Sequence, residues 1–124
     1  MRATSFPAAV LGALLLLSLA TSPASAAHPC KSIQVDQGVG AKVATVRVKC
    51  RVGREVAAIY FQRVRSEDHW DGKTSKGLIF YSVRGFRCFP GLAGTQMFCR
   101  RHSRWIYAST NPDDRPATWR ARAS

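Results

Sequence analysis

The sequence predicts an α+β fold in which one amphipathic helix packs on a small antiparallel sheet, stabilised by two disulfides. Three observations lead to this fold class. Several short segments alternate polar and apolar residues, as strands with one buried face do. The segment 53–65 instead places its apolar residues on one side at helical pitch. Finally, four cysteines occur in a short chain that carries an export signal.

The first 26 residues have the pattern of a cleaved secretory signal peptide. Arg2 precedes an apolar stretch, 10–20, and small residues ending in Ala24-Ser25-Ala26 follow. The apolar stretch is eleven residues long, whereas a membrane-spanning helix needs about 20. A short N-terminal anchor is the alternative, which the good cleavage site disfavours. We therefore expect removal of residues 1–26, no transmembrane segment after cleavage, and one secreted domain at 27–109.

All four cysteines lie in the expected mature part: Cys30, Cys50, Cys88 and Cys99. An even number in a short exported chain indicates a disulfide framework. Four cysteines allow three pairings, and the sequence alone does not choose among them. Local geometry favours Cys30 with Cys50 and Cys88 with Cys99, because the second pair brackets a turn-rich segment. The spacing shows no C-x-x-C or C-x-x-H pair that would indicate zinc.

Two strands are expected before the helix. Residues 32–36 alternate polar and apolar side chains, and a turn at Gly38 and Gly40 follows. Residues 42–50 alternate again, with one face formed by Val46, Val48 and Cys50. A disulfide between Cys30 and Cys50 would then tie the N-terminal segment to the end of the second strand.

The segment 50–64, CRVGREVAAIYFQRV, is a candidate for a buried strand, a membrane-active segment or a helix. With a period of two residues, neither of its faces is uniformly apolar. At about 100° per residue, one sector holds Arg54, Glu55, Gln62 and Arg65. The opposite side is covered by Val56, Ala57, Ile59, Tyr60, Phe61 and Val64. This pattern favours a helix from about Gly53 to Arg65, and so wide an apolar face is typical of a helix packed on a sheet.

The next segments alternate between loop and strand character. Residues 66–77 are polar and indicate a surface loop. Strands are expected at 78–83 and 85–89, with a bulge or bend near Gly85. The sequence PGLAGT at 90–95 predicts a turn.

Two further strands are expected at 96–101 and 104–109, around a tight connection at His102 and Ser103. The segment from Thr110 onward contains two prolines and has no period. We therefore expect residues 110–124 to form a flexible basic tail.

Four short motifs follow one another along the mature chain: an early cysteine before a strand, a cysteine ahead of an R-x-V-A core, a G-[FW]-x-C element, and Cys-Arg-Arg before a basic-aromatic strand. They are Cys30; Cys50 with Arg54-Glu55-Val56-Ala57; Gly85-Phe86-Arg87-Cys88; and Cys99-Arg100-Arg101 running into Trp105-Ile106-Tyr107. In this order the chain resembles a group of uncharacterised small secreted proteins of high-GC Gram-positive bacteria. The resemblance implies a compact α+β domain with two local disulfides, and it brings no catalytic residues.

The charge of the chain is strongly positive. It has 19 Lys and Arg against 7 Asp and Glu, a formal net charge of +12 at pH 7. Only Arg2 is lost with the signal peptide, which leaves 18 basic residues and a net charge of +11. Such a field attracts anionic polymers and surfaces, more weakly as salt rises. High charge as a plain solubility device is the alternative.

Arginines and aromatic residues are interleaved after residue 83. On a sheet, this alternation places a row of guanidinium groups opposite or beside a row of rings. Guanidinium groups bind phosphate and carboxylate bidentately, and rings stack on bases or sugars. The candidate anion-binding residues are Arg84, Arg87, Arg100, Arg101, Arg104 and Trp105. Suitable partners are an anionic cell-wall polymer, a lipid headgroup or nucleic acid. The alternative is that the rings form the core while the arginines solvate the outer face.

Two histidines have neighbours that suggest chemistry. His69 stands among carboxylates in SEDHWD, but this spacing matches no metal-binding loop. His102 stands among arginines, and with Glu55, Glu67 and His69 it could supply the acid–base set of a small nuclease. No ribonuclease motif is present, so an acidic surface patch at His69 and a basic hairpin turn at His102 are favoured.

We therefore expect no catalytic residue, no metal and no cofactor. The sequence predicts a secreted, cationic, non-enzymatic binding protein that acts at the cell envelope or on anionic polymers. A small secreted nuclease or other phosphate-ester hydrolase is the alternative from a different class.

Overall fold

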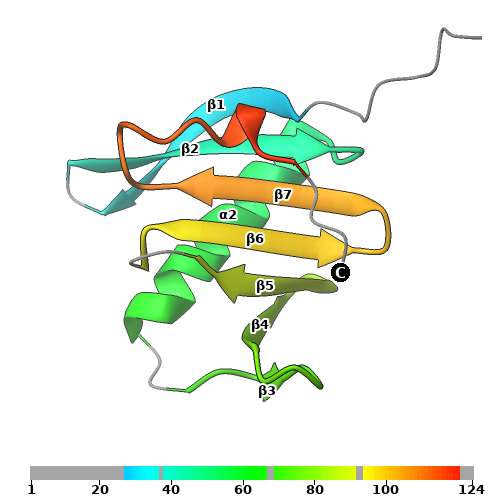
Figure 1. Ribbon diagram of the computed structural model, residues 1–124. Coiled ribbons are helices and arrows are strands. Elements are labelled where there is room, and N and C mark those ends of the chain that lie inside the picture. Colours follow the sequence, from blue (N-terminus) through cyan, green and yellow to red (C-terminus); the bar gives the residue numbers. More distant parts are fainter. Residues whose placement is uncertain (1–26, 37, 67–68, 92–93, 121–124) are drawn as a thin grey trace, which may run out of the picture.

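A computed structural model describes residues 27–120, except for residues 37, 67–68 and 92–93. The expected signal peptide and the end of the expected tail, residues 121–124, lie outside the described residues. The α+β class is confirmed, because one helix packs on a seven-stranded antiparallel sheet (Figure 1). The elements are β1 (His28–Asp36), β2 (Val39–Val46), α2 (Cys50–Ser66), β3 (Gly72–Lys73), β4 (Ile79–Val83), β5 (Phe86–Pro90), β6 (Gln96–Arg101), β7 (Arg104–Ser109) and the 3₁₀ turn η2 (Pro116–Thr118).

The strands lie in the order β1-β2-β7-β6-β5-β4-β3, and every neighbouring pair is antiparallel. Helix α2 leaves β2, crosses behind the sheet and brings the chain to β3 at the opposite edge (Figure 1). The strands that follow return towards β2 through hairpins, until β7 pairs with β2. The helix therefore covers one face of the sheet. Side chains of β5, β6 and β7 lie on the other face.

The expected second strand is too long at its C-terminal end. β2 ends at Val46, because Arg47 adopts a left-handed conformation with φ +59° and turns the chain. The helix begins at Cys50, three residues before the expected start, and the backbone N–H of Gly53 donates to the carbonyl of Lys49 at 2.9 Å. The predicted common face of Val46 and Val48 is therefore wrong. Val46 packs beside Tyr107 on the face opposite α2, whereas Val48, beyond the turn, packs against the core on the helix side.

Three further expectations about the strands need correction. Gly40 lies within β2, so that only Gly38 belongs to the first turn. No bulge interrupts the chain near Gly85; instead Arg84 (φ +51°) and Gly85 (φ +85°) form a two-residue hairpin turn between β4 and β5. Positive φ at both central residues is the mark of a type I′ turn. The expected loop 66–77 contains the short strand β3, which pairs with β4.

The main core lies between α2 and the sheet. The predicted apolar face of the helix is confirmed, since Val56, Ala57, Tyr60 and Phe61 are buried and the remaining two apolar residues are partly buried against the same core. The sheet contributes side chains from every second position of its central strands, among them Val43, Cys88, Met97, Cys99, Ile106 and Ala108. At 0 % exposure, Met97 and Ile106 are as well covered as any helix residue.

Both favoured disulfides are present. Cys30 pairs with Cys50, with a Cα–Cα distance of 5.5 Å, and Cys88 pairs with Cys99. Because β2 stops at Val46, the first bond joins β1 to the first residue of α2 rather than to a strand end. The second bond joins directly opposed residues of β5 and β6.

The segment after Ser109, which we expected to be a flexible tail, packs on the sheet over its described part, 110–120. The Lys42 ammonium donates to the carbonyls of Pro112 and Asp114 at 2.7 and 3.1 Å. Further along, the Trp119 ring lies 5.1 Å from the Phe98 ring, on the face opposite α2. The prediction was wrong because it relied on side-chain periodicity, which this segment lacks. The segment is instead held by the Trp119 ring and a few polar contacts.

No helix within the described residues is long and apolar enough to span a membrane.

Helix α2 lies close against the sheet at Gly53, which is buried on the first turn. A Cβ atom at this position would collide with Cγ2 of Thr45 on β2. The helix can therefore lie directly on the strand only because residue 53 has no side chain.

We expect Gly53→Ala to lower the free energy of unfolding by about 1 kcal/mol. Overpacking costs about 1–3 kcal/mol, which exceeds the gain of about 1 kcal/mol in helix propensity. Urea unfolding followed by circular dichroism measures the change. Combining Gly53→Ala with Thr45→Ser removes the clashing methyl group and should recover most of the loss. A Gly53→Ala protein at least as stable as the parent would contradict this view of the contact.

Candidate anion-binding groove

The sheet face opposite α2 carries two parallel rows of side chains. Cross-strand register places Arg87 opposite Arg100, and Arg100 opposite Trp105. Two residues further along the strands, the second row consists of Phe89, Phe98 and Tyr107. Since side chains alternate between the faces of a sheet, this face is the reverse of the one that buries Cys88, Cys99 and Ile106. The predicted arrangement of a guanidinium row beside an aromatic row is therefore present.

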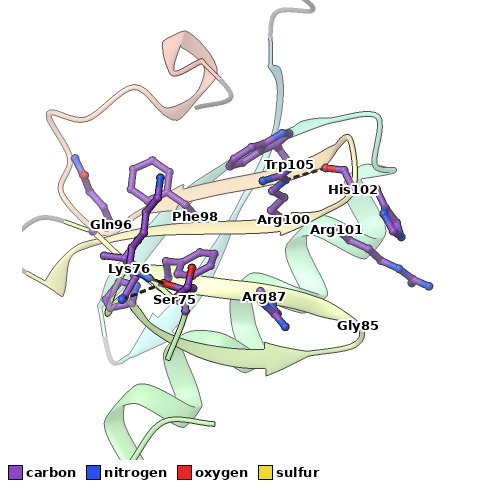
Figure 2. A pocket seen from close by; sticks show the side chains of 15 residues that line it. Ser75, Lys76, Gly85, Arg87, Gln96, Phe98, Arg100, Arg101, His102 and Trp105 are labelled. Carbon is purple, nitrogen blue, oxygen red and sulfur yellow. Dashed lines mark hydrogen bonds between the residues drawn. The ribbon is translucent and has the colours of Figure 1, made fainter. Parts of the chain in front are cut away.

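A groove of about 1010 Å³ crosses both rows in the direction of the strands (Figure 2). One end is bounded by Gly85, Arg101 and His102, in or beside the β4–β5 and β6–β7 turns. The other end is bounded by residues 90–91, Gln96 and the loop 74–78 that joins β3 to β4. Its lining combines cations with exposed or partly exposed apolar side chains: Lys76, Arg87, Arg100, Arg101, Leu78, Phe89, Phe98 and Trp105.

The groove concentrates positive charge without local compensation. Four of the described lining residues are Lys or Arg, and none of the described lining residues is Asp or Glu. Carboxylates elsewhere form ion pairs away from the groove: Arg63 with Asp71, Arg65 with Asp36, and Arg84 with Glu55. The groove is therefore an electropositive channel with partly apolar walls.

Ring contacts and one backbone hydrogen bond orient the two facing arginines. The Arg87 guanidinium lies 4.6 Å from the centre of the Phe80 ring. The Arg100 guanidinium lies 5.5 Å from the centre of the Trp105 ring, and its Nε donates to the His102 carbonyl at 3.0 Å. Among the described residues, neither arginine has a carboxylate partner. Arg87 is exposed and Arg100 is partly exposed, and both guanidinium groups belong to the groove lining.

Arg87 and Arg100 are like charges on directly opposed residues, an arrangement that destabilises a sheet by about 0.2–1 kcal/mol. Arg101 adds a third guanidinium at the same end. A Cβ atom on Gly85 would come within 3.1 Å of Arg101 Nη1, so the glycine leaves the room that this side chain occupies. An oxyanion bound at this end of the groove would offset the repulsion between Arg87 and Arg100.

Four of the six predicted anion-binding residues line the groove: Arg87, Arg100, Arg101 and Trp105. Arg84 is instead directed to the helix side, where its guanidinium pairs with Glu55 at 3.2 Å. Arg104 is exposed next to the β6–β7 turn and does not line the groove. Lys76 and Leu78 were missed, because they come from a segment that the sequence indicates only as a polar loop.

The acid–base set of the nuclease alternative is brought together only in part. His102 lines the groove at the β6–β7 turn, with φ +56°. Glu55 pairs with Arg84, and neither Glu55 nor His69 is among the lining residues. Glu67 lies outside the described residues. Within the described part of the chain, no cluster of three or more His, Cys, Asp or Glu residues could hold a metal ion.

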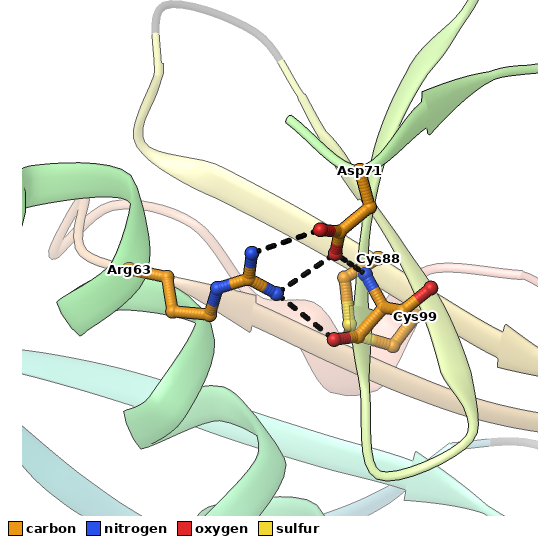
Figure 3. Close-up of a disulfide and its surroundings, with 5 residues drawn as sticks. Arg63, Asp71, Cys88 and Cys99 are labelled. Atoms are coloured by element: carbon orange, nitrogen blue, oxygen red, sulfur yellow. Dashed lines mark hydrogen bonds and ion pairs between the residues drawn. A yellow bond between two sulfur atoms is a disulfide. The ribbon is translucent and has the colours of Figure 1, made fainter. Parts of the chain in front are cut away.

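The wall formed by the loop 74–78 is held from two sides. Arg63 on α2 donates to both carboxylate oxygens of Asp71, at 2.9 and 3.1 Å, and to the Ser82 carbonyl at 2.9 Å (Figure 3). Asp71 in turn accepts the backbone N–H of Ser82 at 2.6 Å. Within the loop, the Thr74 hydroxyl oxygen accepts the backbone N–H groups of Lys76 and Leu78. The helix end, β4 and the wall thus form one connected unit.

The floor of the groove is held by the Cys88–Cys99 disulfide (Figure 3). The bonded residues are fully buried on the helix face. Their neighbours on either side are the facing pairs of the groove, Arg87 with Arg100 and Phe89 with Phe98. A covalent bond on one face therefore sets the pairing of the groove side chains on the other.

No family model matches this chain, and no curated protein or solved structure matches it. The resemblance to small secreted bacterial proteins accordingly stays a prediction. Any inference about function has to be drawn from the groove itself.

We expect the double substitution Cys88→Ala/Cys99→Ala to loosen the groove selectively. Loss of a bond that closes an 11-residue separation costs about 3 kcal/mol on the chain-entropy model. Native-state hydrogen exchange should show reduced protection of the backbone amides of β5 and β6. The matched variant Cys30→Ala/Cys50→Ala should instead reduce protection in β1. If both variants lost protection in the same strands, the disulfide would have no local role.

Asp71 gives the second prediction for this site. Hydrogen bonds from Arg63 and from the Ser82 N–H lower the pKa of its carboxyl from 3.8 to about 2. A lowered pKa stabilises the folded state above about pH 4, and this contribution is lost as the pH falls towards 2. Asp71→Asn should therefore flatten the fall of unfolding free energy between pH 4 and pH 2.

The comparison is made by urea unfolding at a series of pH values, with Asp113→Asn as a control that removes the same charge from an exposed position. Some acid dependence will remain in the Asp71→Asn protein. The pKa of Asp114 is also lowered, by hydrogen bonds from Ser109 and Gln96. An unchanged profile for Asp71→Asn would show that the Arg63–Asp71 network does not stabilise the fold.

Proposed function

We propose that this chain is a secreted, cationic, non-enzymatic protein that binds anionic polymers in its groove, at the cell envelope or in the surrounding medium. The observation that supports this most strongly is the unpaired cationic lining. Lys76, Arg87, Arg100 and Arg101 meet in one groove that has no carboxylate among its described lining residues. Two of these arginines face each other directly.

A polymer with regularly spaced negative charges suits this geometry. Guanidinium groups bind phosphate, sulfate and carboxylate oxygens through paired N–H donors, so each arginine can take one anionic group of the polymer. The net charge of the remaining surface would attract the polymer over a longer range, more weakly at high salt. Two disulfides are compatible with an oxidising compartment outside the cell.

The nuclease alternative has one observation in its favour, since His102 lines the same groove as the arginines. A general acid–base mechanism needs a second group, and no other histidine and no carboxylate is found among the described lining residues. The test is to incubate the parent protein and the His102→Ala variant with RNA and with DNA, and to measure cleavage. Cleavage by the parent protein that is lost in His102→Ala would show that the protein is an enzyme and would contradict the binding proposal.

We expect Arg100→Gln to weaken binding to inorganic polyphosphate by about tenfold at low salt. Losing one charge-assisted contact costs about 1.5–3 kcal/mol, and 1.4 kcal/mol corresponds to tenfold. The slope of the logarithm of affinity against the logarithm of salt concentration should also fall by about one. Fluorescence titration of the intrinsic tryptophans at several salt concentrations measures both quantities.

The matched control is Arg104→Gln, which removes the same charge from an exposed arginine outside the groove. Its affinity should stay close to that of the parent, with an unchanged salt slope. Equal losses in the two variants would show that net charge, and not the groove, is responsible for binding. Absence of salt-sensitive binding in the parent protein would rule out the proposal as a whole.

A further inference from the structure

We infer that the groove binds single-stranded nucleic acid, with backbone phosphates on the arginines and unpaired bases on the aromatic row. This inference rests on the proposed function. It narrows the ligand from anionic polymers in general to a polymer that carries both charges and flat rings.

The spacing of the two rows is the first argument. Arg87 and Phe89 are two residues apart on β5, and Arg100 and Phe98 are two residues apart on β6. A two-residue step along a strand is about 6.7 Å. Charge and ring therefore alternate over a short distance on one open face. A single strand presents the same combination, because each phosphate is joined through a sugar to a base.

The rings of the aromatic row are fixed in place by their neighbours. Phe89 packs against Phe80 with ring centres 6.1 Å apart, and Phe98 packs against Tyr107 at 5.9 Å, both edge to face. Trp105 is stacked on Tyr107 at 5.8 Å with an interplanar angle of 16°. Phe89, Phe98 and Trp105 nevertheless line the groove and keep part of their surface exposed. Rings held in this way can accept a base with little further loss of side-chain entropy.

Cations on both sides of the aromatic row, at the two ends of the groove, distinguish a polymer from a ligand with one charged head. Figure 2 shows Lys76 beside Phe98 and Gln96 at one end, and Arg101 and His102 at the other. From Gln96 to Arg101 the β6 strand covers five steps, or about 17 Å. A lipid headgroup would occupy only one of these ends, whereas successive phosphates of a strand can reach both.

The aromatic row also distinguishes between classes of polyanion. A polyphosphate or a teichoic-acid backbone has charges but no flat ring to place on Phe89, Phe98 or Trp105. A duplex keeps its bases stacked inside and offers only its phosphates to such a row. In a single strand, the bases can stack on the rings of the groove while the phosphates bind its cations.

The test compares two oligomers that have the same charge. We expect the octamer of thymidylate to bind the intact protein at least tenfold more tightly than an abasic octamer with the same number of phosphates, at equal salt. One stacked base contributes about 1–3 kcal/mol, and 1.4 kcal/mol corresponds to tenfold. Fluorescence anisotropy with end-labelled oligomers measures both affinities without any substitution in the protein.

Matched tryptophan variants locate the effect. Trp105→Leu should lose most of the preference for the thymidylate octamer over the abasic octamer. A change in the Arg100 contact that Trp105 supports lowers both affinities together and does not alter their ratio. Trp70→Leu is the control, because Trp70 is exposed and does not line the groove. Circular dichroism and thermal unfolding confirm that both variants are folded. If a folded Trp105→Leu protein kept the preference for the thymidylate octamer, the placement of a base on the Trp105 ring would be contradicted.

The remaining outcomes separate this inference from the proposed function. Equal affinities for the two octamers would overturn the inference and leave the binding of anionic polymers intact. Binding of neither octamer, nor of polyphosphate, would overturn both. A DNA hairpin duplex that binds as tightly as the thymidylate octamer, or phosphatidylglycerol vesicles that bind when the octamer does not, would also overturn the single-strand assignment.

Discussion

The cross-strand bond between Cys88 and Cys99 is the constraint on which both faces of the sheet depend. A one-residue slip between β5 and β6 would move every side chain of the moving strand to the other face. The bond prevents this slip at a buried position in the main core. Packing against the helix and pairing of Arg87 with Arg100 are therefore two consequences of one register.

Acidic side chains are distributed so that they support the frame of the molecule. Asp71 links the end of α2 to β4, Asp114 anchors the segment after β7, and Glu55 holds Arg84 beside the helix. The groove, in contrast, draws its described charged lining from lysine and arginine alone. The carboxylates thus support the scaffold, and the cations of the groove have no carboxylate among the described lining residues.

The helix and β6 could be predicted from the sequence because their side-chain periods are set by burial on one face. The end of β2 could not, since the polar–apolar pattern of the sequence continues to Cys50 although the left-handed turn at Arg47 ends the strand and places Val46 and Val48 on opposite faces. Four groove residues were foreseen from the arginine–aromatic pattern. Lys76 was not, because the wall it belongs to depends on β3 pairing with β4 and on a contact from Arg63, neither of which leaves a local pattern.

The two disulfides differ in how easily dissolved thiols can reach them. Cys30 and Cys50 are partly exposed beside the edge strand β1, so a small reductant can attack this bond in the folded protein. Cys88 and Cys99, at 0 % exposure, are accessible only after the sheet opens. In a thiol-containing medium the tether between β1 and α2 is thus reduced first, while the bond under the groove lasts as long as the sheet stays closed.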